Sequence, residues 1–168
     1  MHQRLQKELI MTAKRLIPLI LSHLMVGIIG FAIGIYTLPI LTAPEAPSSK
    51  LVEQLSQQSV YRAAFTKSLK DSDFLHWGEG TVTIGTSHIT LQGELSPGPD
   101  FKLYLSPTFV ETEADFNKLK SSMRVIGDVN TFSNFAVSVP KGVDVHQFNT
   151  VIVWCESFGE FITAAKYQ

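Results

Sequence analysis

The distribution of apolar residues divides the chain into two parts. Residues 16–41 contain no Asp, Glu, Lys or Arg, and the densest apolar stretch lies between Pro18 and Pro39. At about 1.5 Å per residue, roughly 20 helical residues cover the ~30 Å core of a bilayer. A cleavable signal peptide carries only about 7–15 apolar residues. The pattern therefore predicts an uncleaved transmembrane anchor at 16–41, preceded by a short tail at 1–15.

The segment after the anchor has the composition of a connection. Pro44 and Pro47 disfavour helix in the residues before them, and the serines that follow add flexibility. Leu51, Val52 and Leu55 then share one face of a weakly amphipathic helix that we expect to end near Ser59. We therefore predict a tether and stalk at residues 42–60.

From about Tyr61 the apolar residues alternate with period two, which is typical of strands. Residues 85–87 read as the turn of a hairpin, and Asn130 reads as a turn that pairs the strands on either side of it. The run 151–154 is apolar on both faces, as in a central, buried strand. The predicted strands lie at residues 81–84, 88–92, 101–105, 123–129, 131–139, 151–154 and 161–167.

A short helix is expected to interrupt these strands. Thr112 and Asp115 have the spacing of a capping box, and Phe116 and Leu119 supply an apolar side. Many short strands within about 108 residues are typical of a sandwich. The fold class predicted for residues 61–168 is therefore all-β, a β-sandwich with a short helical insertion.

Charge predicts how the anchor is oriented. Only Lys50 lies close after the span, whereas four basic residues precede it. They are Arg4, Lys7, Lys14 and Arg15. The positive-inside rule then places the N-terminus in the cytoplasm and the C-terminal domain outside, which in a bacterium is the periplasm, facing the inner membrane. Residues 42–168 carry ten basic and fourteen acidic side chains. This negative balance argues against nucleic acid as a partner.

Two features of the span bear on its own partners, besides the lipid bilayer itself. Gly30 and Gly34 have the spacing that lets two helices approach closely, so a homodimer through the anchor is one expectation. The alternative is that glycine is simply common in transmembrane helices. His23 is a polar group in apolar surroundings, and its position near the cytoplasmic end lets it reach the interface.

Cys155 is the single cysteine of the chain and ends the apolar run 151–154. An exported domain with one thiol cannot close an internal disulfide, so the thiol is either buried packing or chemically active. A reactive thiol needs a lowered pKa and access. Its neighbours predict the opposite, because Glu156 would raise the pKa and Trp154 with Phe158 would enclose the sulfur in apolar surroundings.

Few other residues suggest chemistry. The chain has no Cys-x-x-Cys pair, no covalent haem motif and no hydrolase signature. If Cys155 binds haem or copper, the further donors are His76, His88, His146 and Met123, which the fold would have to assemble. Asp100, after Gly98 and Pro99, suggests either a calcium or substrate ligand or a carboxylate that bonds its own turn.

Four ordered segments resemble the DM-thirteen domain, also called the electron-transfer DM-thirteen domain, in a membrane-anchored bacterial form. They are His76–Ile84 (HWGEGTVTI), Gly98–Ser106 (GPDFKLYLS), Ile126–Val129 (IGDV) and Thr150–Phe158 (TVIVWCESF). The resemblance implies a β-sandwich similar to haem-binding and sugar-binding DOMON domains. It also implies a redox role for Cys155, with His76, Trp154 and Asp100 as supporting residues.

Two hypotheses follow. The first is a membrane-anchored periplasmic redox accessory module that transfers electrons through Cys155 to or from a membrane-associated partner protein. The second is a non-catalytic β-sandwich that binds or scaffolds a partner protein or glycan, with Cys155 as a structural residue.

Overall fold

The structure, a computed structural model, describes the backbone of residues 2–168 and the side chains of residues 3, 11 and 14–168. The basic side chains of Arg4 and Lys7, which contribute to the predicted orientation, lie outside the described residues. The chain divides into two compact units, one ending at Leu38 and the other covering Pro39–Gln168, and each is described by itself.

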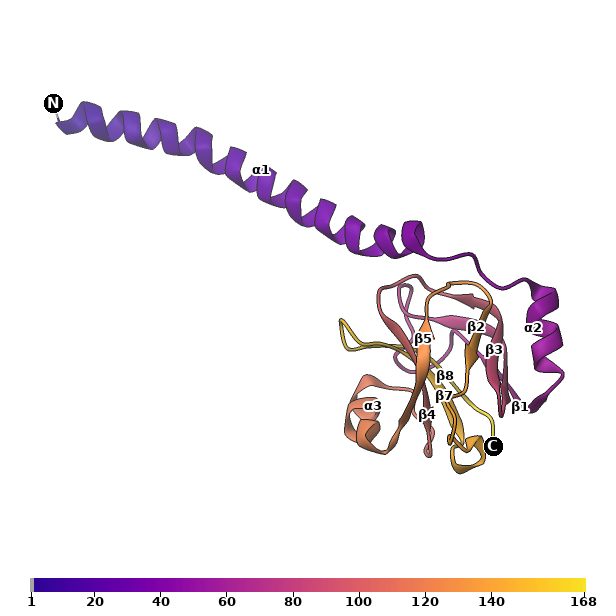
Figure 1. The fold of residues 1–168 in the computed structure, drawn as a ribbon. Helices are drawn as coiled ribbons and strands as arrows, with labels where there is room; N and C mark the ends of the chain where they lie inside the picture. Colours follow the sequence, from indigo (N-terminus) through magenta and orange to yellow (C-terminus); the bar gives the residue numbers. More distant parts are fainter. Residues whose placement is uncertain (1) are drawn as a thin grey trace. The chain divides into compact units, whose positions relative to one another are not determined.

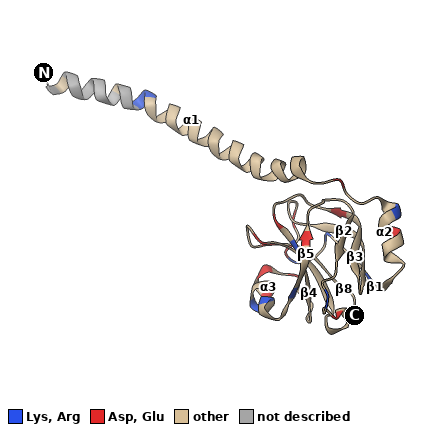
Figure 2. Ribbon diagram, viewed as in Figure 1, with Lys and Arg blue, Asp and Glu red and all other residues tan. Residues whose placement is uncertain are grey.

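The first unit is made by the long helix α1 (His2–Thr42). Its part from Lys14 to Thr42 is 29 residues long, apolar and unburied, so α1 contains a candidate membrane span. Figure 2 shows that the helix carries no charged residue after Arg15. The predicted long apolar N-terminal helix is therefore confirmed, and it extends through the residues expected to form the tail.

The second unit is built on two antiparallel four-stranded sheets (Figure 1). In spatial order the first sheet contains β1 (Ser59–Phe65), β2 (Gly78–Gly85), β3 (His88–Leu95) and β6 (Phe135–Ser138). The second contains β5 (Arg124–Val129), β4 (Phe101–Ser106), β7 (Thr150–Cys155) and β8 (Glu160–Lys166). The predicted β-sandwich is confirmed.

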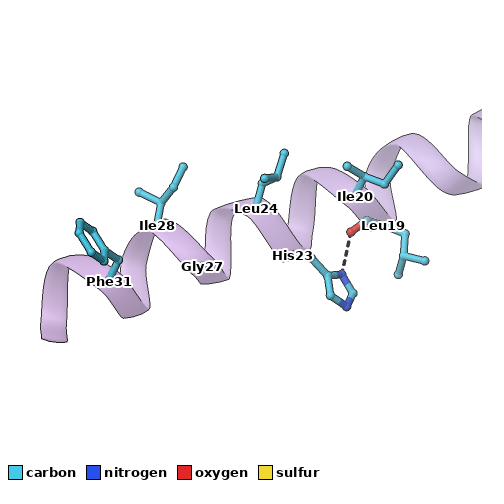
Figure 3. A pocket seen from close by; sticks show the side chains of 7 residues that line it. All are labelled: Leu19, Ile20, His23, Leu24, Gly27, Ile28 and Phe31. Atoms are coloured by element: carbon cyan, nitrogen blue, oxygen red, sulfur yellow. Dashed lines mark hydrogen bonds between the residues drawn. The ribbon is translucent and has the colours of Figure 1, made fainter.

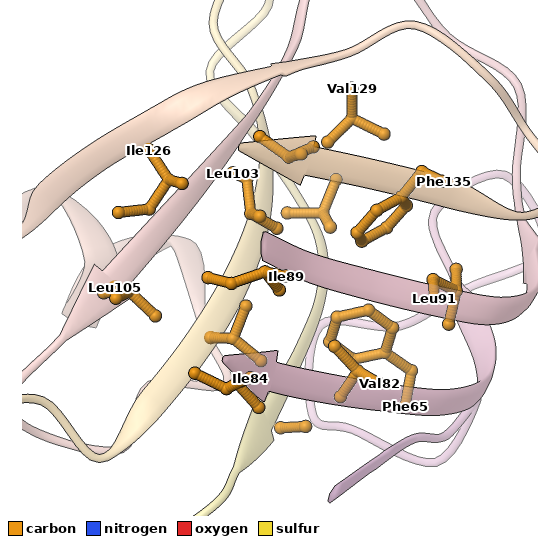
Figure 4. Packing of buried hydrophobic residues seen from close by; sticks show 14 of the residues in the cluster. Phe65, Val82, Ile84, Ile89, Leu91, Leu103, Leu105, Ile126, Val129 and Phe135 are labelled. Carbon is orange, nitrogen blue, oxygen red and sulfur yellow. The ribbon is translucent and has the colours of Figure 1, made fainter. Parts of the chain in front are cut away.

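The main core lies between the inner faces of the two sheets (Figure 4). Side chains alternate along each strand, so every second residue of β2, β3, β4 and β7 enters this core. Val82 and Leu91 come from the first sheet, and Leu103 and Val153 from the second. Burial of these side chains stabilises the fold by about 1.5–3 kcal/mol each.

A second apolar cluster covers the outer face of β4, β7 and β8. The helix α3 (Glu113–Leu119) and the short 3₁₀ helix η1 (Lys120–Ser122) supply its cover, and Phe116 is fully buried there. The Thr112 hydroxyl accepts a hydrogen bond from the Asp115 amide at 3.1 Å, so the predicted helix cap is confirmed. Because both faces of β7 are covered, the predicted central strand at 151–154 is confirmed as well.

The expected pairing of 123–129 with 131–139 is wrong. β5 pairs with β4, whereas β6 pairs with β3 in the other sheet. The connection crosses between the sheets, and the hydroxyl of Thr131 donates to the carbonyl of Asn134 at 2.8 Å within it. Alternation and a turn signal predict two strands, but they do not say whether the chain folds back in one sheet or crosses to the next.

Helix α2 (Ser49–Ser56) lies within the segment expected to be a stalk and packs on the sandwich. It contacts β2, β3 and β6, and its Val52 is 2% exposed. On the face of the first sheet opposite the core, the hydroxyls of Thr83 and Thr90 are buried and hydrogen-bond each other at 2.7 Å. α2 is therefore part of the folded domain.

Neighbouring substitutions in α2 test this docking. Val52→Asp would bury an unpaired carboxylate, so we expect it to lower the free energy of unfolding by roughly 2–4 kcal/mol. Leu51→Asp changes a residue that is 44% exposed, so its effect should stay within about 0.5 kcal/mol. Urea unfolding of the full chain in detergent micelles measures both, and equal effects would contradict the docked helix.

Candidate functional site

Cys155 is the last residue of β7 and lies opposite Phe101 of β4 in the sheet register. Its side chain belongs to the main core and the residue is 3% exposed. The sulfur donates a hydrogen bond to the Pro99 carbonyl oxygen at 3.0 Å. The thiol therefore sits at the end of a central strand, where the core meets the loops.

Two loops meet over this end of the strand, and we call their contact the turn clasp, made by Pro99 and Asp100 with residues 155–159. The Glu156 amide donates to the Asp100 carbonyl at 3.1 Å, and the Ser157 hydroxyl donates to the Asp100 carboxylate at 3.0 Å. Within the second loop, the Gly159 amide donates to the Cys155 carbonyl at 2.9 Å. The clasp joins two segments that are about 55 residues apart in sequence.

Asp100 has a positive φ of 54°, a conformation that an L residue adopts at a cost of about 1–2 kcal/mol. Its carboxylate contacts the ammonium of Lys102 at 3.1 Å, and the hydrogen bonds from Lys102 and Ser157 hold its pKa below the usual range. The carboxylate thus bonds Lys102 and the opposing loop. It closes the clasp instead of bonding its own turn.

Burial raises the pKa of the Cys155 thiol above its ordinary value, and the negative charges of Asp100 and Glu160 act in the same direction. The backbone N–H groups of Phe158 and Ser157 oppose the shift. Near neutral pH the sulfur is therefore protonated, and it must be uncovered before it can react as a thiolate.

Glu156 does not contribute to this shift as the sequence suggested, because its side chain turns to the outer face. Its carboxylate accepts hydrogen bonds from the Tyr104 hydroxyl and from Lys120, the latter at 2.7 Å. Although burial acts to raise it, the pKa of Glu156 is held below its usual range by Lys120 and Tyr104. Burial and the contact with Glu156 raise the pKa of Tyr104.

Trp154 lies on the opposite face of β7 from Cys155. Its ring stacks on Phe116 with centroids 3.8 Å apart and planes 10° apart, and the residue is 1% exposed. Phe158, in the loop of the clasp, is 53% exposed. The expectation that Trp154 encloses the sulfur is therefore wrong, because strand alternation sends Trp154 into the second cluster.

His76 is not brought to the clasp by any contact in the structure. Its ring nitrogen Nδ1 lies 3.2 Å from the Asp73 carboxylate, and its amide donates to the same carboxylate at 2.7 Å. Burial acts to raise the pKa of Asp73, but the N–H groups of Leu75 and His76 lower it below its usual range. His76 therefore orders the loop before β2.

The donors available for copper or haem do not fit a site at Cys155. Within the part of the chain that the structure describes, no group of three or more His, Cys, Asp or Glu side chains is arranged to hold a metal ion. The sulfur is buried and donates its hydrogen bond to the Pro99 carbonyl. His88 contacts Ser87, and His146 contacts Tyr61.

A hollow on the surface of α1 is lined by residues of that helix alone (Figure 3), and His23 and Gly27 are among them. The ring nitrogen Nδ1 of His23 lies 2.8 Å from the Leu19 carbonyl of the preceding turn. A Cβ at Gly30 or Gly34 would meet nothing within 4 Å. These positions are open to another helix, and the homodimer through the anchor stays a prediction.

Comparison with known families decides the assignment. The family model described as Electron transfer DM13 matches residues 54–167. The chain belongs to the Electron transfer DM13 family. No curated protein and no solved structure matches it. The family description supports a redox-related role for the domain, and both halves of the turn clasp lie within the matched residues.

Sequence reasoning missed Ser157, Lys120 and Tyr104. The hydroxyl of Ser157 and the carboxylate of Asp100 sit in separate loops, and only the pairing of β4 with β7 brings them together. Asp100 lies just before one apolar strand and Ser157 just after another, each within a family segment. This shared position is the one feature of the sequence that could have linked the two residues. Lys120 and Tyr104 lie in separate elements, and no pattern in the sequence indicates that both bond Glu156.

The raised pKa of Cys155 predicts a pH-dependent stability. The folded chain holds the thiol proton more tightly than the unfolded chain. The stability that the protonated thiol contributes to the folded chain is fully present below the pKa of an unfolded thiol, about 8.5. It is lost as pH rises above that value towards the higher pKa of the folded chain. We expect the free energy of unfolding to fall more in the wild type than in Cys155→Ala between about pH 7 and about pH 9.5. Urea titrations at both pH values measure this, and parallel losses would contradict it.

Proposed function

We propose that this chain is a membrane-anchored electron-transfer module whose sandwich lies in the periplasm, attached to the inner membrane of a bacterium, with Cys155 as its redox residue. The proposal is supported by the family description, the candidate span in α1 and the basic residues that precede it.

The observation that carries the role of Cys155 is its place at the very end of β7. The loop of residues 156–159 covers it on the chain's C-terminal side, where Gly159 has a positive φ of 71° and Phe158 is half exposed. We infer that the sulfur becomes accessible when this loop separates from Pro99 and Asp100, while the core between the sheets stays closed. Local openings of this kind require less free energy than global unfolding.

The chemistry that suits a lone thiol is exchange with a disulfide of a partner protein. The uncovered Cys155 thiol loses its proton to water, and the thiolate attacks one sulfur of the partner's disulfide. That S–S bond breaks, a mixed disulfide forms, and the released partner thiolate takes up a proton. A first thiol of a donor dithiol then attacks the Cys155 sulfur of the mixed disulfide, and the partner leaves with both of its sulfurs reduced. The donor's second thiol attacks the donor sulfur of the new mixed disulfide, which releases Cys155 as a thiolate that takes up a proton. The donor is left as a disulfide, so two electrons have passed from donor to acceptor.

The short connection favours a partner at the membrane. Only residues 43–48 lie between the end of α1 and the start of the docked helix α2, and six extended residues reach at most roughly 20 Å. The Asn134 side chain also donates to the Pro47 carbonyl at 3.2 Å. A partner that meets the domain must therefore itself lie close to the bilayer surface.

The second candidate is a binding or scaffolding sandwich in which Cys155 is structural. The burial of the thiol, its bond to Pro99 and its raised pKa favour this function. The two functions differ in one measurable respect, which is whether the sulfur becomes accessible through a local opening or only when the whole domain unfolds.

Alkylation of the native thiol tests the redox role. Ser157→Ala removes the hydroxyl that bonds Asp100, and the loss of about 0.5–1.5 kcal/mol from the clasp should raise the labelling rate of Cys155 by roughly two- to tenfold. Ser122→Ala in η1 removes a comparable hydroxyl, which donates to the Leu119 carbonyl at the end of α3, and should leave the rate unchanged. Mass spectrometry of the full chain in micelles measures both rates.

The urea dependence of labelling separates the two functions. A local opening exposes little surface, so the rate should change little in low urea. Labelling that rises with the full urea dependence of global unfolding, and equally in both serine variants, would exclude the redox role and leave the scaffold.

Orientation is tested independently. A reporter that is active only outside the cytoplasm should be active when fused after Gln168 and inactive when fused before the N-terminus. The replacement of Lys14 and Arg15 by Glu should lower the activity of the C-terminal fusion by removing half of the basic residues before the span. Activity of the N-terminal fusion in the wild type would overturn the proposed topology.

A further inference from the structure

Tyr61 of β1 faces an imidazole. Its hydroxyl lies 2.7 Å from the ring nitrogen Nδ1 of His146, in the 3₁₀ helix η2 (Val145–Gln147), 85 positions away in sequence. The two rings meet edge to face with centroids 5.5 Å apart. When His146 carries its proton on Nε2, the phenol donates to Nδ1. A phenol is thereby joined directly to a base that can receive its proton.

The surroundings hold this pair in place. The ring of Tyr167 packs against Tyr61 with centroids 5.1 Å apart, and its own hydroxyl donates to the Val145 carbonyl at 2.9 Å. The Asp144 carboxylate caps η2 by accepting from the His146 amide at 3.1 Å. The Gln168 side chain donates to the His146 carbonyl at 2.9 Å. The half-buried Tyr61 ring is fixed, while the imidazole remains exposed to solvent.

The other two tyrosines of the sandwich have weaker proton acceptors. Tyr104 donates to Glu156, whose pKa is kept below its usual range by Lys120 and Tyr104 although burial opposes this. Tyr167 donates to a backbone carbonyl, which is a very weak base, and burial raises the pKa of its phenol. Among the tyrosines of the described domain, Tyr61 therefore has the best-placed base for losing a proton during oxidation.

We propose that Tyr61 and His146 form a proton-coupled redox site that reduces a one-electron oxidant of high potential, such as a ferryl haem or a peroxyl radical. One electron leaves the phenol for the oxidant, and the phenolic proton moves along the hydrogen bond to Nδ1. The O–H bond breaks and an N–H bond forms, which gives a neutral tyrosyl radical and an imidazolium. The imidazolium returns its proton to solvent or to the phenolate when the radical is reduced.

Proton transfer is what lowers the barrier. A tyrosyl radical cation is a very strong acid, so oxidation without a base would have to form it as a high-energy species. A base within hydrogen-bond reach avoids that step, and positioned bases of this kind commonly contribute roughly 10²–10⁴-fold in rate. The inference goes beyond the proposed function, because neither Cys155 nor its clasp takes part.

The groups around the pair favour the charge that oxidation creates. Asp144 lies at the start of η2 and Tyr167 lies after β8, and the β2 residue opposite Tyr61 is the apolar Ile84. The carboxylate of Asp144 stabilises the positive charge that forms when the phenolic proton moves to Nδ1.

The test uses the full chain in detergent micelles with Cys155→Ala, which removes the thiol as an electron source. A photo-oxidised ruthenium tris(bipyridine) complex serves as the one-electron oxidant, and tyrosyl radical is followed by transient absorption and electron paramagnetic resonance. Tyr61→Phe should remove most of the early radical, whereas Tyr104→Phe and Tyr167→Phe, which each remove one phenolic hydroxyl as well, should keep it.

The imidazole is tested separately. His146→Ala should slow radical formation by roughly 10²-fold, the contribution expected of a positioned base. Added imidazole should restore part of the rate, because His146 is exposed; a merely structural role predicts no such rescue. Circular dichroism confirms that each variant is folded.

Two outcomes would overturn the proposal. In one, the early radical persists in Tyr61→Phe, which places the oxidised residue elsewhere. In the other, folded His146→Ala keeps the wild-type rate, so the imidazole receives no proton. If His146→Ala fails to fold, the comparison of Tyr61→Phe with Tyr167→Phe decides alone. Neither outcome bears on Cys155, whose alkylation is measured in a chain that keeps its thiol.

Discussion

The antiparallel pairing of β4 with β7 is the contact on which the domain depends. Both strands are central in their sheet, and both have apolar residues on their two faces. Such a pair is stable only where each face meets another apolar layer. The first sheet supplies one layer and Phe116 of α3 supplies the other. Removing either layer would expose apolar side chains of β4 and β7 to water and lower the stability of the fold.

The same pairing also builds the candidate site. Because the strands run antiparallel, the start of β4 lies beside the end of β7, so the loop before one meets the loop after the other. Cys155 is therefore placed under Pro99 and Asp100, and Trp154, one residue earlier, enters the opposite layer. Cys155 and the stacked Trp154 are adjacent in sequence, but their side chains lie on opposite faces of the sheet.

Local pattern was enough to predict the sandwich, the central position of 151–154 and the helix capped by Thr112. Each of these depends on residues a few positions apart. The partners of 123–129 and 131–139 were predicted wrongly, because the crossing near Asn134 is decided by contacts with β3 and β4. The docking of α2 was missed for a related reason, since Val52 is buried by residues of a distant sheet.

The site was only partly predictable. Cys155 and Asp100 were both candidates, yet neither periodicity nor motif spacing relates positions 55 apart. His76 and Trp154 also lie in family segments, but neither side chain reaches the turn clasp. His76 bonds the nearby carboxylate of Asp73, and Trp154 packs in the apolar cluster beneath α3. Tyr61 and His146 carry no local signal at all, since the phenol lies in an ordinary strand and the imidazole in a short turn.

The course of β8 gives the domain two separate chemical ends. Glu160, at its start, pairs with Cys155, and Tyr167 follows its last residue, beside Tyr61. Seven residues of extended chain separate these two points by roughly 20 Å. Because substitutions this far apart usually act independently, a change at one end of β8 should leave the contacts at the other end unaltered.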